Sequence, residues 1–219
     1  KNLDGMKFEP VLITLYDEQE DSQMADFLPY VSKHYFVKTG KKDIILGKTK
    51  ALKNILESMG ADVVYSTGVF PDYAVSKIMP SKQMITLHNY VYEDYIAKFG
   101  KAMGIILAKL QLAAVKKASY VVTCSKSLAK IYKQRLHQSY DYIRNGVDIE
   151  QYTLPNINEK LAIRKELGLP ENAFIWIYTG QFIERKNIPF LLENYVKKFG
   201  NDIHSYMLLL GGGPELNIL

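Results

Sequence analysis

The hydrophobic positions along the chain form short apolar runs that alternate with longer amphipathic stretches. Six of these runs in the first two thirds are rich in β-branched and aromatic residues, so they predict strands. The expected strands cover residues 11–16, 35–37, 62–65, 84–87, 120–124 and 140–143. Because strands that alternate with helices pair in parallel, the pattern predicts a doubly wound α/β sheet over residues 11–143.

The helices between these strands are placed by their periodicity and end signals. Asp43 is expected to cap a helix that ends at Gly60, and Ser125 to cap the helix that follows the fifth strand. Residues 91–117 predict helix with a break at Gly100. The residues expected on the inward face of this helix are Met103, Ile106, Leu107, Leu110 and Ala114.

A boundary between two domains is expected after residue 147. Asn145–Gly146 is a turn signal, and a new helix begins after Pro155, with Asn156 as its cap and Glu159 at the capping-box position. The pattern therefore divides the chain into a domain over residues 1–147 and a second domain over residues 148–219. A strand at 175–178, an amphipathic helix closed by Gly200 and a strand at 207–210 predict a βαβ unit. Since two strands cannot bury their faces as an independent sheet, we expect the second domain to be incomplete in this chain, or the missing part of its sheet to come from a partner.

Three polar turns follow predicted strands and are the candidate functional sites. Arg185 and Lys186 lie in the charged loop after the strand at 175–178, and Gly211 and Gly213 lie in the turn after the next strand. Cations beside glycine backbone, at the carboxyl ends of parallel strands, predict a phosphate-binding site. His88 directly follows the strand at 84–87, which places it at the ligand edge of the first domain.

Composition and charge restrict the class of partner. The chain is 47% hydrophobic and 23% charged, with a net charge of +5 and a pI near 9.0. This mild basicity suits anionic small molecules or an acidic membrane surface and makes no case for nucleic acid. The longest apolar stretch, residues 103–115, is interrupted by Lys109 and Gln111 and is too short to span a bilayer. We therefore expect a cytoplasmic protein with at most a peripheral membrane contact.

No metal site or nucleophile is predicted. The single cysteine, Cys124, has no histidine near it in the sequence and is interpreted as a small buried side chain. Neither a metal-ligand spacing of Cys and His nor an Asp-x-Asp pair is present. The acidic run at residues 17–21 is interpreted as a solvated loop in preference to a metal site.

Four short motifs follow one another along the second half of the chain: Arg144–Asp148, Arg164–Pro170, Tyr178–Gln181 with Arg185–Asn187, and Leu210–Pro214. In this order and spacing they resemble the GT-B fold glycosyltransferases of the retaining, nucleotide-sugar-dependent group 1 / family 4 type. The resemblance is close over about residues 84–219 and only architectural before that. It implies two Rossmann-like domains, the second of them truncated, with the acceptor on the first and the nucleotide-diphosphate sugar on the second.

What the resemblance implies for function is a hexosyltransferase. It would move a sugar from a nucleotide-diphosphate donor to a sugar or lipid-linked acceptor, in surface polysaccharide or glycolipid synthesis, with retention and without a metal or other cofactor. His88 would contact the donor sugar, while Arg185 and Lys186 would stabilise the leaving diphosphate. The chain departs from the family at Gln181, where an arginine is usual.

Two parts that the family possesses are expected outside these residues. The first strand with its glycine-rich loop would precede Lys1, and a pair of donor-binding glutamates would follow Leu219. We therefore expect the 219-residue chain alone to be inactive.

Two other functions are compatible with the same pattern. A sugar-nucleotide epimerase shares the fold and the glycine turns, but it would need acid/base carboxylates that form no convincing pair here. A non-catalytic module that binds a sugar or a partner would have kept the fold and lost the cationic clamp, and Gln181 is the feature that favours this alternative.

Overall fold

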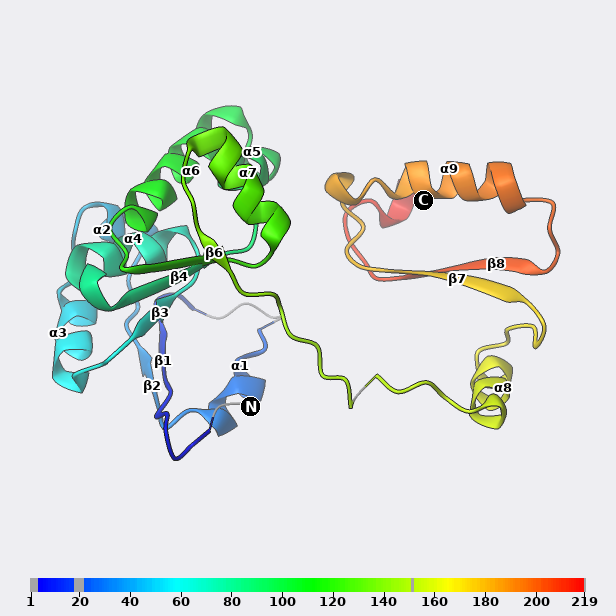
Figure 1. Cartoon of the computed structure of the whole chain (residues 1–219), viewed down its shortest axis with the longest axis horizontal. Coiled ribbons are helices and arrows are strands. Elements are labelled where there is room, and N and C mark those ends of the chain that lie inside the picture. Colours follow the sequence, from blue (N-terminus) through cyan, green and yellow to red (C-terminus); the bar gives the residue numbers. More distant parts are fainter. Residues whose placement is uncertain (1–3, 18–21, 151, 219) are drawn as a thin grey trace. The chain divides into compact units, whose positions relative to one another are not determined.

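The structure is a computed structural model that describes residues 4–17, 22–150 and 152–218. The chain forms two compact units, Lys1–Gly146 and Val147–Leu219, which are described separately. Both units are mixed α/β with parallel strands, as the hydrophobic pattern predicts. Figure 1 gives the elements of each unit.

The first unit contains all six predicted strands, with seven α-helices between and around them in its described residues. The strands are β1 (Val11–Thr14), β2 (Lys33–Phe36), β3 (Val64–Ser66), β4 (Gln83–Leu87), β5 (Tyr120–Thr123) and β6 (Asp141–Tyr142). The helices are α1 (Met24–Phe27), α2 (Lys41–Ile45), α3 (Lys50–Met59), α4 (Val69–Ile78), α5 (Val91–Phe99), α6 (Lys101–Val115) and α7 (Lys126–Leu136).

These strands form two parallel sheets in place of the single predicted sheet. One sheet pairs β1 with β2, and the other has the order β3-β4-β5-β6. The prediction of one sheet over residues 11–143 is therefore wrong, because β3 has three residues and pairs only with β4 among the described strands. Side chains join the two sheets instead: Leu15 after β1 and Val64 of β3 pack into one apolar cluster with α3 and α4.

Most of the helix end signals are confirmed. Gly60 ends α3 with φ of 60°, the left-handed conformation that glycine adopts at low cost. The Ser125 side chain accepts a hydrogen bond from the amide of Leu128 at 3.1 Å and caps α7. The capping role of Asp43 is wrong, because this residue lies inside the separate short helix α2.

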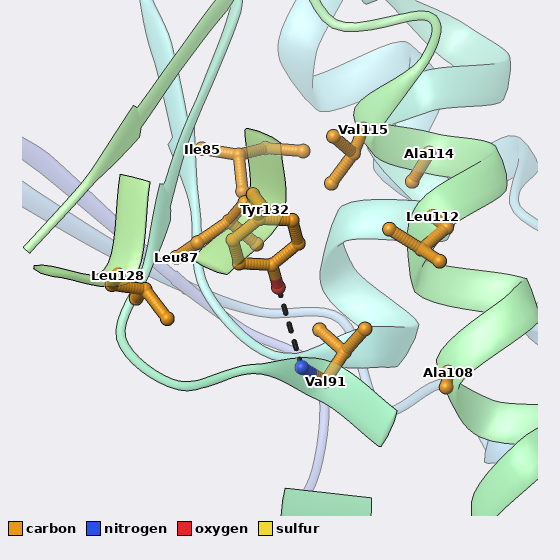
Figure 2. Close-up of a cluster of buried hydrophobic side chains, with 9 residues drawn as sticks. All are labelled: Ile85, Leu87, Val91, Ala108, Leu112, Ala114, Val115, Leu128 and Tyr132. Carbon is orange, nitrogen blue, oxygen red and sulfur yellow. Dashed lines mark hydrogen bonds between the residues drawn. The ribbon is translucent and has the colours of Figure 1, made fainter. Parts of the chain in front are cut away.

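The larger core of the first unit lies between the β3–β6 sheet and the helices α6 and α7 (Figure 2). Its buried members are Ile85, Leu87, Val91, Ala108, Leu112, Ala114, Val115, Leu128 and Tyr132. Tyr132 is fully buried, and its hydroxyl donates to the carbonyl of Asn89 at 3.1 Å and accepts from the amide of Val91 at 3.3 Å. The α7 tyrosine therefore fixes the loop that follows β4.

The inward face predicted for α6 is only partly correct. Leu107 and Ala114 are buried, but Met103 and Ile106 are 51% and 59% exposed. Close packing with α5 sets this rotation, because a Cβ added at Gly104 would overlap the backbone of Ile96. A helix that is apolar on nearly all sides has no strong preference of its own for one face, so the glycine contact decides which face is inward.

A buried polar network links α4, α5 and α6. Asp72 on α4 is fully buried, and its Oδ2 accepts from the Gln111 amide at 2.7 Å. The carbonyl oxygen of the Gln111 side chain accepts in turn from the Tyr95 hydroxyl. Asp72 forms no ion pair with a described residue, and its Oδ1 has no hydrogen-bond partner there. Burial without a cation therefore raises the pKa of the Asp72 carboxyl above its usual range.

The second unit is built on the predicted βαβ unit. It contains α8 (Ile157–Glu166), β7 (Phe174–Thr179), α9 (Ile188–Phe199) and β8 (Ser205–Leu210). The capping box of α8 is confirmed, with Asn156 and Glu159 exchanging two hydrogen bonds at 2.8 and 3.0 Å. β7 and β8 pair in parallel in a sheet of their own, as predicted. The short helical turn Glu184–Lys186 precedes α9.

Replacing Asp72 with asparagine tests the buried carboxyl. The folded chain, with the raised pKa, binds more protons than the unfolded chain over the pH range between the ordinary value of 3.8 and the folded pKa. The contribution of Asp72 to the free energy of unfolding therefore decreases as the pH rises through that range. Asp72→Asn lacks this term, so its stability relative to wild type should be greater at pH ~7 than at pH ~4. Urea unfolding of both chains at both pH values measures this, and a pH-independent difference would contradict it.

Candidate functional site

The first unit has a pocket at the carboxyl ends of β3 and β4. Its volume is about 360 Å³, and His88 lies on its wall, immediately after β4. Thr67 and Gly68, which follow β3, line the same pocket. Adjacent parallel strands deliver their following residues to one edge of the sheet, so the fold itself brings these segments together.

The His88 side chain is exposed and forms no hydrogen bond with a described residue. Its backbone is held in place, because its carbonyl accepts from the Cys124 thiol at 3.3 Å. The Tyr132 contacts fix the next residues of the same loop. A fixed backbone with a free imidazole is suited to contacting a ligand. Cys124 is only half-buried, so its interpretation as a buried side chain is wrong, and its thiol holds the loop through the bond to His88.

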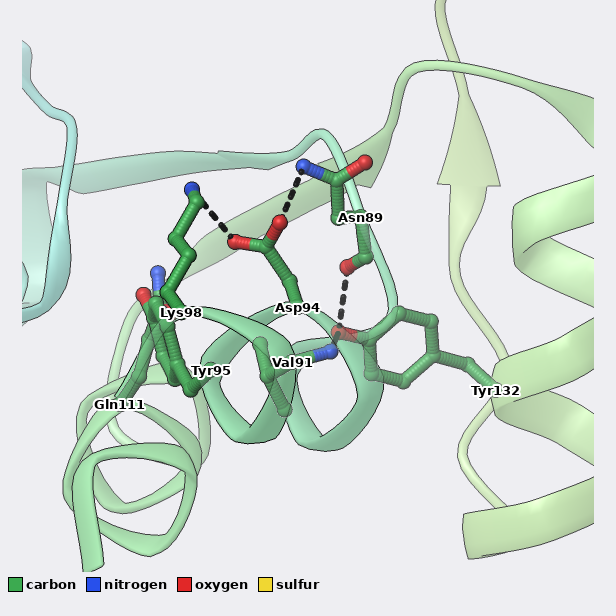
Figure 3. Close-up of polar contacts among 7 residues, drawn as sticks. All are labelled: Asn89, Val91, Asp94, Tyr95, Lys98, Gln111 and Tyr132. Carbon is green, nitrogen blue, oxygen red and sulfur yellow. Dashed lines mark hydrogen bonds and ion pairs between the residues drawn. The ribbon is translucent and has the colours of Figure 1, made fainter. Parts of the chain in front are cut away.

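An acidic group with two donors forms one side of the pocket. The Asp94 carboxylate accepts from Asn89 Nδ2 at 3.3 Å and from Lys98 Nζ at 2.9 Å (Figure 3). Asp94 is only 8% exposed, and the ammonium of Lys98 compensates its charge within the pocket wall. Lys41 also lines the pocket, and its ammonium lies 5.7 Å from the centre of the Phe70 ring.

Tyr95 and Gln111 form the part of the pocket that joins the buried network. Because an ionised or protonated Asp72 can accept on Oδ2, the Gln111 amide donates to it and presents its oxygen to Tyr95. The Tyr95 hydroxyl donates to that oxygen, which leaves its lone pairs for a donor in the pocket. Burial raises the pKa of Tyr95, so the hydroxyl keeps its proton near neutral pH. A ligand with hydroxyl groups matches this arrangement.

In the second unit the loop after β7 and the turn after β8 are joined through backbone bonds. The amide of Gly180 donates to the carbonyl of Leu210 at 3.0 Å, and that of Phe182 donates to the carbonyl of Gly212 at 2.8 Å. A Cβ at Gly211 would overlap the backbone of Gly180, and one at Gly213 would overlap that of Phe182. Gly211 and Gly213 are thus required for the contact between the two segments, whatever ligand they approach.

The cations of this loop are available to a ligand. Arg185 and Lys186 are exposed in the turn that precedes α9, and within the described residues neither side chain forms a hydrogen bond or ion pair. The Gln181 side chain is exposed as well, while its carbonyl accepts from the Tyr178 hydroxyl at 3.2 Å. The structure therefore brings the loop with Arg185 and Lys186 to the glycine turn. His88 belongs to the other unit.

The pocket contains residues that the sequence pattern did not single out. Asp94, Tyr95, Lys98 and Gln111 lie on α5 and α6, which were interpreted as structural helices. A signal was present: Gln111 interrupts an otherwise apolar helix, and Asp94 and Lys98 have the spacing of an ion pair on one turn. This spacing is common on solvated helices and does not by itself indicate a site. Asp94 and Lys98 belong to a site because α5 lies beside the end of β4.

Neither a metal site nor a spanning helix is found in the part of the chain that the structure describes. No group of three His, Cys, Asp or Glu residues could hold a metal ion there. Residues 18–21 of the acidic run lie outside the described residues, so its interpretation as a solvated loop stays a prediction. The described helices are all too short or too polar to cross a membrane.

Comparison with known proteins places the chain among glycosyltransferases. It is 25% identical over 179 residues to the O-antigen biosynthesis glycosyltransferase WclY of Escherichia coli, covering 80% of this chain and 48% of that protein. It is 23% identical over 214 residues to the Escherichia coli UDP-Gal:alpha-D-GlcNAc-diphosphoundecaprenol alpha-1,3-galactosyltransferase, covering 94% of this chain and 53% of that protein. The chain thus spans about half the length of these relatives.

The fold agrees with this relationship. The crystal structure of Anabaena Alr3699/HepE in complex with UDP and glucose matches 92% of this chain and 61% of that one, with a TM-score of 0.52 at 14% identity. The sequence profile of Glycosyltransferase Family 4 matches residues 1–151, which is more than half of the chain. The chain belongs to Glycosyltransferase Family 4.

Proposed function

We propose that the protein carrying this chain transfers a hexose from a nucleotide-diphosphate sugar to a sugar or lipid-linked acceptor, with retention at the anomeric carbon. The observation that carries the proposal is the joined loop and turn of the second unit. Two exposed cations, which have no partner among the described residues, lie in the loop, and the glycine turn is bonded to it at the ends of β7 and β8. An anion of the size of a diphosphate fits this combination of charge and accessible backbone.

The resemblance to the family suggests that the acceptor binds the first unit and the donor the second. The second unit would bind the nucleotide diphosphate, and Arg185 and Lys186 would stabilise the charge that develops on the leaving group. The pocket of the first unit offers hydroxyl-accepting and hydroxyl-donating side chains at Tyr95 and Asn89, which suits the sugar of the acceptor. His88, free on the wall of this pocket, would contact the donor sugar and orient it for transfer.

The relatives support the class of substrates. The galactosyltransferase of Escherichia coli is named for UDP-galactose and a diphosphoundecaprenol-linked sugar, and a further relative, from Acholeplasma laidlawii, is named alpha-monoglucosyldiacylglycerol synthase. The latter is 24% identical over 157 residues, which cover 67% of this chain and 39% of that protein. Acceptors attached to lipid, in polysaccharide or glycolipid synthesis, are therefore the ones we propose, together with a peripheral contact between the protein and the membrane that holds them.

Arg185 and Lys186, and not residue 181, should supply the charge that binds phosphate. Removing one charge-assisted contact, worth about 1.5–3 kcal/mol, should weaken UDP binding roughly tenfold or more in Arg185→Ala and in Lys186→Ala. Gln181→Arg should change affinity little, because the loop is already cationic. Calorimetric titration of the full chain with UDP measures all three.

Lys197→Ala is the matched control, since it removes an exposed cation from α9 in the same unit without touching the loop. Wild-type affinity in both loop variants, or an equal loss in the control, would show that the loop is an ordinary solvated surface. UDP binding without sugar transfer by the whole enzyme would favour the non-catalytic module.

His88→Ala should lower the turnover of the whole enzyme by about ten- to a hundredfold while the protein stays folded, because a misoriented donor sugar reacts slowly. The measurement is kcat with a UDP-sugar, together with a thermal melt of each variant. His204→Ala, an exposed histidine of the second unit, serves as control. If kcat is the same in His88→Ala and in the control, His88 has only a structural role.

A further inference from the structure

The buried network of Asp72, Gln111 and Tyr95 is not explained by stability alone. The Asp72 side chain is fully buried and forms no ion pair with a described residue. A well-packed apolar side chain usually stabilises a core at least as well as a buried charged group does. Polar groups that break this rule are expected at functional sites, and one end of the network lines the pocket.

Contacts in the core hold Asp72 in position. Asp72 lies on α4 and is not part of the pocket wall, whereas Gln111 and Tyr95 are. Its main-chain carbonyl accepts from the side-chain amide of Gln83 at 2.8 Å, and Gln83 is itself fully buried on β4. The carboxyl therefore faces Gln111 from a fixed place behind the pocket wall.

The direction of each hydrogen bond in this network is set by the group before it. Asp72 Oδ2 accepts both when the carboxyl is ionised and when Oδ1 carries the proton, so Gln111 turns its amide nitrogen to Asp72, at 2.7 Å. This turns the side-chain oxygen of Gln111 to Tyr95, whose hydroxyl must then donate. Because a hydroxyl has one proton, Tyr95 can only accept from a ligand in the pocket.

We propose that Asp72 is a positioning residue that sets the direction of these hydrogen bonds, and that it thereby selects a sugar hydroxyl as the ligand group beside Tyr95. A group that only accepts, such as an ether oxygen or the carbonyl of an N-acetyl group, would face the Tyr95 oxygen with no proton between them. Asp72 acts on the ligand only through Gln111 and Tyr95. The inference rests on the proposed function, since it takes the ligand of this pocket to be the acceptor sugar.

A purely structural role is the alternative, in which the network only joins α4 to α6. The two roles make different demands on position 72. A structural link is kept by any side chain of the same shape that forms a hydrogen bond to Gln111. The positioning role requires a group that accepts, so a donor of the same shape distinguishes the two.

Replacing Asp72 with asparagine keeps the shape and adds a donor. Asp72 Oδ1 has no hydrogen-bond partner among the described residues, so an amide nitrogen at that point would leave its N–H groups unbonded. The nitrogen introduced by Asp72→Asn should therefore take the place of Oδ2 and donate to the side-chain oxygen of Gln111. Gln111 would turn over and donate to Tyr95, and the Tyr95 proton would become free for a ligand.

NMR of the full chain measures this reversal without a ligand. The nuclear Overhauser effect between the amide protons of Gln111 and the ring protons of Tyr95 should be several-fold stronger in Asp72→Asn than in the wild-type chain. Ser76→Ala is the matched control, because it removes a hydroxyl that is also buried on α4 but bonds within that helix. An unchanged effect in Asp72→Asn, or the same change in the control, would overturn the proposal.

Titration with methyl α-D-glucopyranoside, methyl α-D-galactopyranoside and their monodeoxyfluoro analogues tests the selection of a hydroxyl. Fluorine replaces one hydroxyl at a time with a group that cannot donate. In the wild-type chain the analogue whose fluorine faces Tyr95 should bind about three- to tenfold more weakly than its parent sugar. In Asp72→Asn and in Tyr95→Phe, parent and analogue should bind within about twofold of each other. Ser76→Ala should keep the wild-type preference.

The double variant Asp72→Asn, Tyr95→Phe separates positioning from a general effect on the pocket. If Asp72 acts through Tyr95, the double variant should bind both sugars as Tyr95→Phe alone does, whereas unconnected effects would add. Additive losses, or equal binding of parent and analogue by the wild-type chain, would overturn the proposal, while UDP binding by the second unit would leave the proposed function standing. If the wild-type chain binds neither parent sugar, this proposal and the acceptor site proposed for the pocket are both wrong.

Discussion

The parallel pairing of strands is the constraint on which both units depend. When β4 pairs with β3 and β5, and β7 pairs with β8, the carboxyl ends of neighbouring strands meet at one edge. Every loop that follows a strand then lies at that edge, and the helices pack on a face of the sheet and return the chain to its opposite edge. The pocket around His88 and the joined loop and turn of the second unit are both results of this one geometric rule.

At each edge a different device holds the loop in a defined conformation. In the first unit a buried tyrosine from α7 bonds the backbone after β4, so the side chain of His88 can stay free while its main chain is fixed. In the second unit two segments approach so closely that glycine is required at Gly211 and Gly213. In both units the polar side chains stay exposed, while contacts of the main chain fix the conformation of the loop that carries them.

Much of this organisation could be predicted from the sequence, because periodicity and end signals are local. The strands, the break at Gly100 and the caps at Ser125 and Asn156 depend on a few neighbouring residues, and the structure confirms them. The division into two sheets and the rotation of α6 depend on contacts between distant segments, so the local pattern did not predict them. The same holds for the pocket residues on α5 and α6: their spacing is ordinary, and only the tertiary fold places them beside a strand end. The roles proposed for His88, Arg185 and Lys186 stay predictions.

The glycine contact between α5 and α6 has a consequence outside the core. Since Gly104 lies directly against the backbone of Ile96, the helix α6 cannot turn about its axis without breaking that contact. Met103 and Ile106 flank this glycine in the sequence and point outward for the same reason. Gly104 is buried and has no side chain, yet it determines which side chains of α6 are exposed to solvent. A requirement on the exposed face of this helix would therefore act on the buried position 104, where it would exclude even the methyl group of alanine.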